Sequence, residues 1–494
     1  MTNIKSNGKI LETLTSLSKQ RGFIFQSSEN YGGLGSTWDY GPLGVELKRN
    51  IKNHWWKKMV TTRENIVGMD ASILMHPKVW EASGHVDCFN DPLVDNKETK
   101  KRYRLDHLLE EQASEVIDNL DHRLSEGSDK SKNTDDKIQG IISSLHKMES
   151  KSGQVLIESE VIDPFDNKVG QWTNLRQFNL MFKTHAGPVE DSSSVVYLRP
   201  ETAQGIFVNF PNVQSTSRQK LPFGIAQLGK AFRNEITTGN FIFRTREFEQ
   251  MEMEYFCHPN ETGKWLEYWA KERINWFISL GVSKDNLRLR PHGEDELAHY
   301  SSSCYDVEYK FDFGWSELEG IADRGTYDLD QHAKHSGKRL TYFDQPNNQH
   351  LIPGVVETSA GVDRALLTVL ADAYTKEDVK DEKRVVLKLS PEIAPTTVAV
   401  FPLMNKAGQP ETAKNIVKDL RGEFSAFFDS GGSIGRRYRR QDEAGTPFGI
   451  TVDHQTQEDQ TVTLRDRDTM EQVRVSLDKV RDAVRDKIKE YSAS

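Results

Sequence analysis

The chain of 494 residues is 36% hydrophobic and 28% charged, with a formal net charge of −9, a balance that predicts a globular protein of two or three domains. No apolar run approaches the length that spans a bilayer, and the N-terminus lacks a signal-peptide pattern. Three cysteines without a C-x-x-C pair exclude a disulfide framework and a zinc ribbon, so we expect a reduced, cytoplasmic protein with no membrane partner.

Two segments within the first 152 residues have distinct patterns. Between 43 and 59 apolar side chains recur at every fourth position, which predicts a helix with one apolar face, and Pro42 suits its first turn. Residues from about 106 to 152 are strongly polar with two amphipathic patches. They predict a helical insertion whose centre, around 125–136, has a composition typical of disorder.

The chain from Val195 to about Leu370 predicts mostly strands separated by turns. Within it, two strand-like runs flank the turn at 237–240 and predict a long antiparallel hairpin over 224–256. Because side chains alternate along a strand, one face of the second run collects charged and polar groups. This face comprises Arg244, Arg246, Phe248, Gln250, Glu252 and Glu254. A solvated charged face and a binding surface both fit this pattern.

From about Arg384 onward, strand-like and helical patterns alternate, which predicts a compact α/β domain of roughly a hundred residues. One stretch concentrates positive charge around an aromatic residue: Arg436, Arg437, Tyr438, Arg439 and Arg440. Such a group suits contact with phosphates and stacking on a base of a single-stranded loop. An ordinary solvated charge run is the alternative. An acidic chain that binds RNA needs a local concentration of positive charge of this kind.

The residue order in the predicted hairpin resembles motif 2 of the class II aminoacyl-tRNA synthetases. Arg233-x-Glu235 precedes the turn, and Arg244-x-x-x-Phe248 follows it. The string GVVETSAGVDRALLTVL resembles motif 3, and the helix opened by GPLG resembles motif 1, which builds the dimer interface in this class. The sequence has no P-loop and no Rossmann fingerprint after a strand, which agrees with an ATP site on an antiparallel sheet.

Longer strings narrow the resemblance to the glycyl-tRNA synthetases of the homodimeric type. They are YGPLGVELKRN, RQFNLMFKTHAGPVED, YLRPETAQGIFVNF, WSELEGIADRGTYDL and ETSAGVDR, in the family order. The resemblance implies an α+β fold. A class II catalytic domain, an antiparallel sheet flanked by helices, would span 1–384, and this domain would include the insertion at about 106–152. An α/β anticodon-binding domain over 385–494 follows. It also implies a cytoplasmic homodimer that attaches glycine to the 3′ end of tRNA(Gly) through glycyl-adenylate.

The resemblance implies an ATP site built on motifs 2 and 3. Phe248 would stack on adenine and Glu235 would meet the adenine edge. Arg233 would hold the α-phosphate and Arg244 the γ-phosphate, because a guanidinium fork binds phosphate oxygens in pairs. Arg233 and Arg364 are implied as the catalytic residues. The implied ATP-binding set is Arg233, Asn234, Glu235, Phe243, Arg244, Thr245, Arg246, Glu247, Phe248, Glu317, Leu318, Gly361, Val362, Asp363 and Arg364.

Glycine has no side chain, so carboxylates must bind its ammonium group, and a filled pocket must exclude any β-carbon. The implied glycine-binding set is Arg104, Glu201, Phe248, Glu249, Gln250, Met251, Glu252, Glu357, Thr358, Ser359, Ala360 and Gly361. Arg102 is the alternative to Arg104.

The resemblance leaves metals and partners to be tested. Glu317 is implied as support for a Mg²⁺ ion that bridges ATP phosphates. Many relatives carry a cysteine pair shortly before the arginine at 104, but Asn96 and Thr99 stand there in this chain, so we expect no zinc. The stretch 436–440 is implied to contact tRNA. Two alternatives remain, a non-catalytic nucleic-acid-binding protein on the same scaffold and a class II synthetase for another amino acid.

Overall fold

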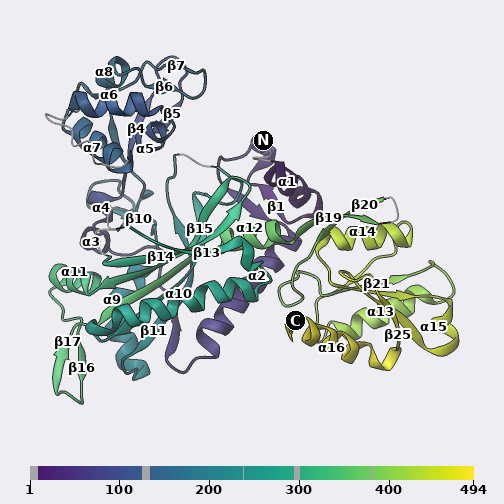
Figure 1. Cartoon of the computed structure of the whole chain (residues 1–494). Coiled ribbons are helices and arrows are strands. Elements are labelled where there is room, and N and C mark those ends of the chain that lie inside the picture. Colours follow the sequence, from purple (N-terminus) through teal and green to yellow (C-terminus); the bar gives the residue numbers. More distant parts are fainter. Residues whose placement is uncertain are drawn as a thin grey trace.

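The computed structural model describes residues 9–124, 134–148, 150–236, 239–293, 297, 301–379 and 382–493. The chain forms a central sheet domain, a small lobe between residues 90 and 180, and a C-terminal domain (Figure 1). Most of the interval 125–136 lies outside the described residues, as does the first half of the predicted turn at 237–240. Among the described residues, no helix is both long and apolar enough to cross a membrane.

Seven strands form the central sheet in the order β13-β14-β15-β18-β12-β11-β3. Neighbouring strands run antiparallel, except that β11 and β3 are parallel. The strands are β3 (Ile66–Met69), β11 (Phe223–Phe232), β12 (Glu247–Cys257), β13 (Leu287–Pro291), β14 (Ser303–Phe311), β15 (Gly314–Gly325) and β18 (Gly354–Gly361). The predicted antiparallel hairpin is confirmed by the pairing of β11 with β12.

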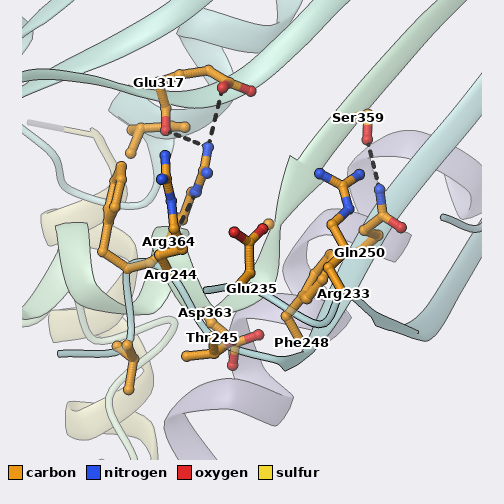
Figure 2. A pocket seen from close by; sticks show the side chains of 14 residues that line it. Arg233, Glu235, Arg244, Thr245, Phe248, Gln250, Glu317, Ser359, Asp363 and Arg364 are labelled. Carbon is orange, nitrogen blue, oxygen red and sulfur yellow. Dashed lines mark hydrogen bonds and ion pairs between the residues drawn. The ribbon is translucent and has the colours of Figure 1, made fainter. Parts of the chain in front are cut away.

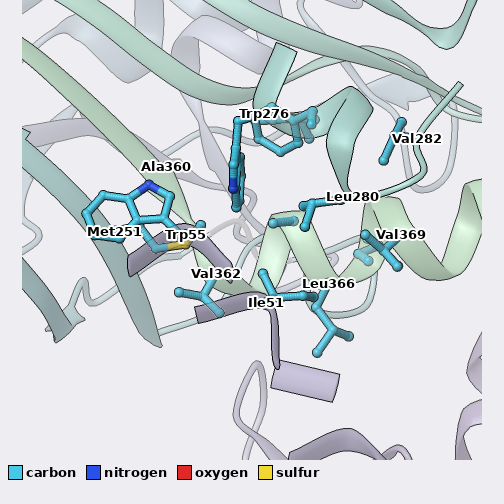
Figure 3. Close-up of a cluster of buried hydrophobic side chains, with 14 of the residues drawn as sticks. Ile51, Trp55, Met251, Trp276, Leu280, Val282, Ala360, Val362, Leu366 and Val369 are labelled. Atoms are coloured by element: carbon cyan, nitrogen blue, oxygen red, sulfur yellow. The ribbon is translucent and has the colours of Figure 1, made fainter. Parts of the chain in front are cut away.

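The main hydrophobic core packs α2, α10 and α12 against one face of this sheet (Figure 3), and α1 adds Leu14 and Leu17 to it. Ile51 and Trp55 of α2 are fully buried there, as is Leu366 of α12, and Trp276 of α10 is 4% exposed. The apolar face predicted between 43 and 59 is therefore confirmed as the packing face of α2. A second cluster lies on the other side, where α9 and α11 pack against β11, β12 and β18.

The expectation of mostly strands between 195 and 370 is confirmed in part: strands are the more numerous elements among the described residues there, but α9, α10, α11 and α12 also lie in this interval. In α10, the buried Leu266, Trp269, Arg273 and Trp276 follow a helical period that charged residues between them obscure. The helices of the central domain are α1 (Lys9–Arg21), α2 (Pro42–Trp56), α3 (Pro77–Ala82), α4 (His85–Cys88), α9 (Ala203–Ser217), α10 (Thr262–Ser279), α11 (Tyr327–Ser336) and α12 (Val362–Ala373). Its short hairpin strands are β1 (Ile24–Gln26), β2 (Trp38–Tyr40), β9 (Lys183–His185), β10 (Val195–Tyr197), β16 (Tyr342–Asp344) and β17 (Gln349–Leu351).

The lobe has its own hydrophobic cluster, which runs from Val94 to Leu175 and so extends beyond the interval 106–152 on both sides. Its elements are β4 (Asn90–Asp95), β5 (Arg102–Arg104), α5 (Leu105–Glu110), α6 (Ser114–Leu124), α7 (Thr134–Lys147), α8 (Ser152–Glu158), β6 (Ile162–Asp163), β7 (Lys168–Val169) and β8 (Arg176–Asn179). Asp163 joins two hairpins here, because its Oδ2 accepts hydrogen bonds from Asn96 at 2.6 Å and Thr99 at 2.7 Å. Asn96 and Thr99, on which the expectation of no zinc rests, are thus hydrogen-bonded to one carboxylate.

The C-terminal domain is a five-stranded sheet in the order β22-β21-β23-β24-β25, covered by helices. The predicted alternation of strands and helices is confirmed. The elements are β21 (Val398–Pro402), α13 (Gln409–Leu420), β22 (Ala426–Phe428), α14 (Ile434–Ala444), β23 (Phe448–Val452), α15 (His454–Asp459), β24 (Thr461–Asp466), β25 (Gln472–Ser476) and α16 (Val480–Ala493). The preceding hairpin, β19 (Tyr374–Val379) and β20 (Glu382–Leu387), contains the expected boundary at 384. Arg384 itself bonds to Asp442 of α14 at 2.9 Å.

Candidate active site

One cavity with two pockets lies on the central sheet, where β18 runs between β15 and β12, and Figure 2 shows the first of the two pockets. The first, here named the arginine pocket, is lined by Arg233, Glu235, Ile242, Phe243, Arg244, Thr245, Phe248, Gln250, Glu317, Leu318, Ser359, Gly361, Asp363 and Arg364. The second, here named the glutamate pocket, is lined by Glu201, Arg233, Gln250, Glu252, His292, Ser301, Cys304, Asp306, Glu317, Gly320, Ala322, Glu357 and Ser359. Four lining residues are common to both pockets, so the pockets adjoin.

Strand alternation accounts for most of the lining. In β12, Phe248, Gln250 and Glu252 face the cavity, while Met251 and Met253 between and beyond them are buried in the core. The same period places every second residue of β18, from 357 to 361, on the cavity face. The predicted face of the second hairpin strand is therefore confirmed from Phe248 onward.

The arginines that precede β12 do not follow this alternation, which corrects the prediction. The backbone before the strand turns through left-handed conformations at Asn240 (φ 57°) and Phe241 (φ 60°). As a result the adjacent Arg244 and Thr245 both line the arginine pocket. Arg246 instead donates hydrogen bonds to two backbone carbonyl oxygens at 2.9 and 3.1 Å, outside the pocket.

Arg364, in the first turn of α12, is held at one wall of the arginine pocket. Its Nη1 donates to the carbonyl oxygen of Glu317 at 2.9 Å and lies 3.2 Å from Oε2 of the same residue. Its guanidinium carbon lies 4.6 Å from the ring centroid of Phe243. Burial opposes ionisation of Glu317, but Arg364 and then Arg233 hold its pKa below the ordinary value. Glu317 is therefore an ionised oxygen donor of the kind that Mg²⁺ accepts.

Arg233 stands between the two pockets. Its Nε donates to the carbonyl oxygen of Pro200 at 3.1 Å, and its guanidinium carbon lies 5.4 Å from the Phe248 ring centroid. Burial, and then the positive charge of Arg364, lower the pKa of Arg244 across the pocket. The guanidinium groups of Arg233, Arg244 and Arg364 thus converge on one space, which favours binding of a polyanion such as a nucleoside triphosphate.

Asp363 lines the arginine pocket, but its carboxylate is already fully engaged. Oδ1 accepts a hydrogen bond from Lys48 at 2.8 Å and another from the Tyr40 hydroxyl, and Oδ2 accepts from the backbone N–H of Glu249 at 2.9 Å. Asp363 therefore ties α2 and β2 to β12 at the edge of the pocket. The Glu249 side chain lies 2.9 Å from Lys48 on the face opposite the cavity, which corrects its assignment to glycine.

Three buried carboxylates meet in the glutamate pocket: Glu201, Glu252 and Glu357. Burial and the charges of Glu357 and Glu201 raise the pKa of Glu252 to about 8. Burial also raises the pKa of Glu357, although Arg324 opposes the shift. Burial acts in the same direction on Glu201, but His85 and Arg324 hold its pKa below the ordinary value. The side chains of this pocket are thus short of positive charge, which an ammonium group would supply.

Hydrogen bonds hold these carboxylates in place. The backbone N–H of Thr202 donates to Glu252 Oε2 at 3.1 Å, and the Thr202 hydroxyl bonds the same oxygen. Arg324 Nη1 lies 3.2 and 3.1 Å from the two oxygens of Glu357. Sequence analysis missed Arg324, because an arginine in a strand gives no sign of which distant carboxylate it contacts.

Nine residues predicted to contact a substrate line neither pocket: Arg104, Asn234, Arg246, Glu247, Glu249, Met251, Thr358, Ala360 and Val362. Most of them occupy the alternate strand positions, whose side chains point away from the cavity. Arg104 is different. Burial lowers the pKa of its side chain, but the charges of Asp106, Asp91 and Glu235, the last in the arginine pocket, raise this pKa above the ordinary value. Arg102 instead pairs with the Asp95 carboxylate at 2.7 Å. The structure therefore brings Arg104, rather than Arg102, within electrostatic reach of the cavity.

Among the described residues, two groups have enough nearby ligand atoms to hold a metal ion, and both border the cavity. They are His292 with Cys304 and Asp306, and Glu252 with Glu254 and Glu357. In the first group the ligands already interact, because His292 Nε2 lies 2.7 Å from Asp306 Oδ2. The second group contains the pocket carboxylates described above.

The basic stretch in the C-terminal domain forms α14, and its side chains point in different directions. Arg437 is 3% exposed and donates to the carbonyl oxygen of Gly432 at 2.8 Å. The Tyr438 hydroxyl lies 2.7 Å from Thr451 Oγ1, inside the domain. Arg436 and Arg439 are exposed. Arg437 and Tyr438 therefore stabilise the domain, which corrects their assignment to tRNA contact.

Comparisons with known proteins agree with this architecture. Residues 91–180 match the family described as glycyl-tRNA synthetase insertion domain 1, residues 182–388 the tRNA synthetase class II core domain (G, H, P, S and T), and residues 397–487 the anticodon binding domain. The prolyl-tRNA synthetase of Cryptosporidium parvum, solved with L-proline and AMP, has a TM-score of 0.61 at 11% identity, covering 99% of this chain and 80% of that chain. The fold and the cavity define a class II aminoacyl-tRNA synthetase, and the predicted fold class is confirmed.

Closer relatives narrow the assignment. The glycine–tRNA ligase of Caldanaerobacter subterraneus subsp. tengcongensis is 51% identical over 97% of this chain and 98% of that protein. The glycine–tRNA ligase of Treponema denticola is 49% identical over 97% and 98%, and that of Staphylococcus epidermidis 50% over 97% and 99%. The chain belongs to the glycine–tRNA ligase family, which confirms the predicted enzyme class.

Proposed function

We propose that this protein attaches glycine to the 3′ end of tRNA(Gly) in two steps, with glycyl-adenylate as the intermediate. The observation that carries the proposal is the division of one cavity into an arginine pocket and a glutamate pocket. The charges of the substrates match this division. The positive ammonium group of glycine suits the glutamate pocket, while the negative glycine carboxylate and ATP phosphates suit the arginines. Arg233 stands at the junction, where the two substrates must react.

In the first step the glycine carboxylate attacks the α-phosphorus of ATP, and pyrophosphate leaves. A carboxylate is already a competent nucleophile, so catalysis consists of positioning and charge stabilisation. Arg233 would neutralise charge that develops on the α-phosphate, and Arg364 and Arg244 would hold the outer phosphates. Phe248 would stack on adenine and Glu235 would accept from its amino group. The prolyl-tRNA synthetase above was also solved with AMPPNP, a nucleotide of the same shape as ATP.

A Mg²⁺ ion fits the arginine pocket, because Glu317 is ionised there and Mg²⁺ is usually bound by carboxylates together with substrate phosphates. When bound, Mg²⁺ would neutralise part of the triphosphate charge. Glu317, in β15, would hold it from the wall of the arginine pocket. This chain's own arginines would still orient the α-phosphate.

For glycine, Glu201, Glu252 and Glu357 would bind the ammonium group. Ser359 closes the pocket on the side of Gln250, to which it bonds at 3.2 Å. A larger amino acid would have to displace side chains that are fixed by hydrogen bonds, which a packed site resists. The second step is attack of the terminal ribose 3′-hydroxyl of tRNA on the adenylate carbonyl, which forms the glycyl ester and releases AMP and the hydroxyl proton.

The partners follow from the same reasoning. The anticodon-binding domain supports tRNA(Gly) as a partner, with Arg436 and Arg439 as exposed candidates for contact. We infer a homodimer, in which α2 would contribute to the interface, and a cytoplasmic location. A non-catalytic role on the same scaffold is disfavoured, because Arg233, Arg244 and Arg364 all converge on the cavity.

Amino-acid-dependent ATP–pyrophosphate exchange without tRNA tests the proposal. Each of the proteinogenic amino acids is assayed separately, with Mg²⁺ present. Exchange with glycine alone supports both the activation step and the pocket assignment. Exchange with another amino acid contradicts the glycine assignment but keeps the class. No exchange by folded protein contradicts the enzymatic proposal and favours the binding protein.

A further inference from the structure

A buried glutamine lies directly behind the glutamate pocket. Gln204, in the first turn of α9, is fully buried, and its Nε2 lies 2.8 Å from Glu201 Oε1 and 3.0 Å from Asp328 Oδ1. Its Oε1 lies 2.7 Å from Nε2 of His332, which belongs to α11 and is 5% exposed. One amide therefore connects a pocket carboxylate, a second carboxylate and a histidine.

The chemistry of these groups fixes the direction of each hydrogen bond. Ionised carboxylates only accept, so the amide nitrogen of Gln204 must face Glu201 and Asp328. The amide oxygen then faces His332 and also only accepts. His332 must therefore carry its proton on Nε2. Burial lowers the pKa of His332, so the neutral ring with its proton on Nε2 is the form that fits at neutral pH.

The same amide also reaches a second carboxylate of the pocket. Arg324 holds both oxygens of Asp328, at 2.7 and 2.8 Å, and pairs with Glu357 through Nη1. Gln204 thus contacts Glu201 directly and Glu357 through Asp328 and Arg324. Among the residues that line the cavity, neither His332 nor Gln204 is present. Their effect on a substrate must pass through these carboxylates.

We propose that His332 is a positioning residue for the substrate ammonium group, and that it acts by holding the Gln204 amide against Glu201. The proposal rests on the proposed function in one respect, because it takes Glu201 as a ligand of glycine. Without the His332 donor, the buried Gln204 oxygen has no partner in this contact. The amide is then free to move toward another donor, and Glu201 loses its fixed geometry.

His332 also borders a hollow of about 640 Å³ that residues of α3, α9 and α11 line together, His335 among them. Truncation of His332 would open a path from this hollow to Gln204. Water that entered could replace the lost donor but could not fix the amide as a ring held by packing does. The defect should therefore be a looser glycine site rather than an unfolded protein.

The first test is His332→Ala, assayed by ATP–pyrophosphate exchange with glycine and ATP varied in turn. We expect the KM for glycine to rise about tenfold, as loss of one buried hydrogen bond implies, while the KM for ATP and kcat at saturating glycine change by less than about twofold. His335→Ala is the matched control, because this histidine is exposed on the same helix and does not reach Gln204. It should leave both KM values unchanged.

Two further variants separate positioning from a structural role. A glutamine side chain can place an N–H near the position of the histidine Nε2, so His332→Gln should restore most of the affinity for glycine. Gln204→Met removes the amide while keeping its length. If His332 acts only through Gln204, the double variant His332→Ala/Gln204→Met should be no worse than Gln204→Met alone.

The outcomes are distinguishable. If the wild-type protein shows no glycine-dependent exchange, the proposed function fails before this inference is reached. If the wild type is active but His332→Ala keeps its glycine KM, the positioning role is wrong. A fall in kcat with equal changes in both KM values, or additive effects in the double variant, would mean that His332 supports the fold only, and would also overturn the proposal.

Discussion

The two pockets of the cavity use charges of opposite sign, and they differ also in whether those charges can be lost. The arginine pocket is built from guanidinium groups, which stay protonated at any pH at which the protein is folded. The glutamate pocket is built from carboxylates whose pKa values burial and mutual repulsion move in different directions. One pocket therefore has a fixed charge and the other a charge that depends on pH. We expect pH to act on glycine binding much more than on ATP binding.

The largest effect is expected from the fixed-charge side. Arg233→Ala should lower the rate of glycine-dependent ATP–pyrophosphate exchange by about 10²–10³-fold, as loss of one group that stabilises transition-state charge does in other enzymes. Unchanged thermal unfolding would show that the fold is intact. Arg218→Ala, which removes an exposed arginine at the end of α9, is the control and should be fully active. Near-normal exchange by the Arg233 variant would refute its role.

On the glutamate side, Glu201→Gln tests the division between the pockets. This change removes the negative charge that faces the ammonium group while keeping the shape. We expect the KM for glycine to rise about 10–100-fold, because hydrogen bonds to charged groups contribute roughly 1.5–3 kcal/mol, and the KM for ATP to stay the same. Both constants come from the exchange assay. A parallel rise in both KM values would contradict the sorting of substrates between the two pockets.

Glu252→Gln tests the pH dependence. The pKa of Glu252, about 8, lies above that of an unfolded glutamate, so this group favours the folded state at low pH and the benefit is lost as pH rises through 8. The variant should therefore unfold at a higher temperature than wild type at pH 8.5, and the difference should shrink toward pH 5. In the wild type, the KM for glycine should fall a few-fold between pH 7 and 8.5, because ammonium binding prefers the ionised carboxylate. The variant should lose this trend.

Glu249→Gln is the matched control with the opposite sign. Burial raises the pKa of Glu249, but Lys48 and Lys52 outweigh this effect and hold the pKa below the ordinary value. Its contribution to stability is present above the unfolded pKa and is lost as pH falls through the folded pKa. The Glu249 variant should therefore be less stable than wild type at pH 8.5. If both variants shift the unfolding temperature in the same direction, the assignment of the two environments is wrong.

The smallest effect is expected outside the cavity. Arg436→Ala should leave pyrophosphate exchange unchanged and weaken tRNA charging about two- to threefold. Loss of one phosphate contact should also make tRNA binding less dependent on salt. The slope of the logarithm of the binding constant against the logarithm of the salt concentration should change by about 0.7–0.9. Arg437→Ala should instead lower the unfolding temperature, because this arginine bonds to backbone inside the domain. A lower pyrophosphate exchange rate in the Arg436 variant would contradict the separation of the two domains' roles.

The sequence was most informative where the backbone is regular. Once the hairpin was identified, period two predicted that Phe248, Gln250 and Glu252 share a face, and the cavity lies on that face. The prediction failed where the chain leaves the strand, at Arg244 and Arg246. The left-handed backbone continues from Asn240, a residue type that adopts it readily, to Phe241, where nothing in the sequence signals it.

Burial of arginines was the other limit. In α14 nearly every side chain is polar, so no apolar stripe indicates which face packs on the domain, and Arg437 proved to be buried. Contacts such as Arg324 with Glu357 depend on strands that meet only in the folded sheet. Residue type alone could name the candidates for charge recognition but could not pair them.

The carboxylate of Asp363 has a consequence for how the protein is made. It bonds to Tyr40 and Lys48, which lie 323 and 315 positions earlier in the chain. Contacts over such sequence separations form late, because the intervening chain must first be available. During synthesis from the N-terminus, α2 leaves the ribosome long before α12 exists, with Lys48 lacking this partner. The edge of the arginine pocket can close only after about three quarters of the polypeptide has been translated, so products truncated before Asp363 will lack its bonds to Tyr40 and Lys48.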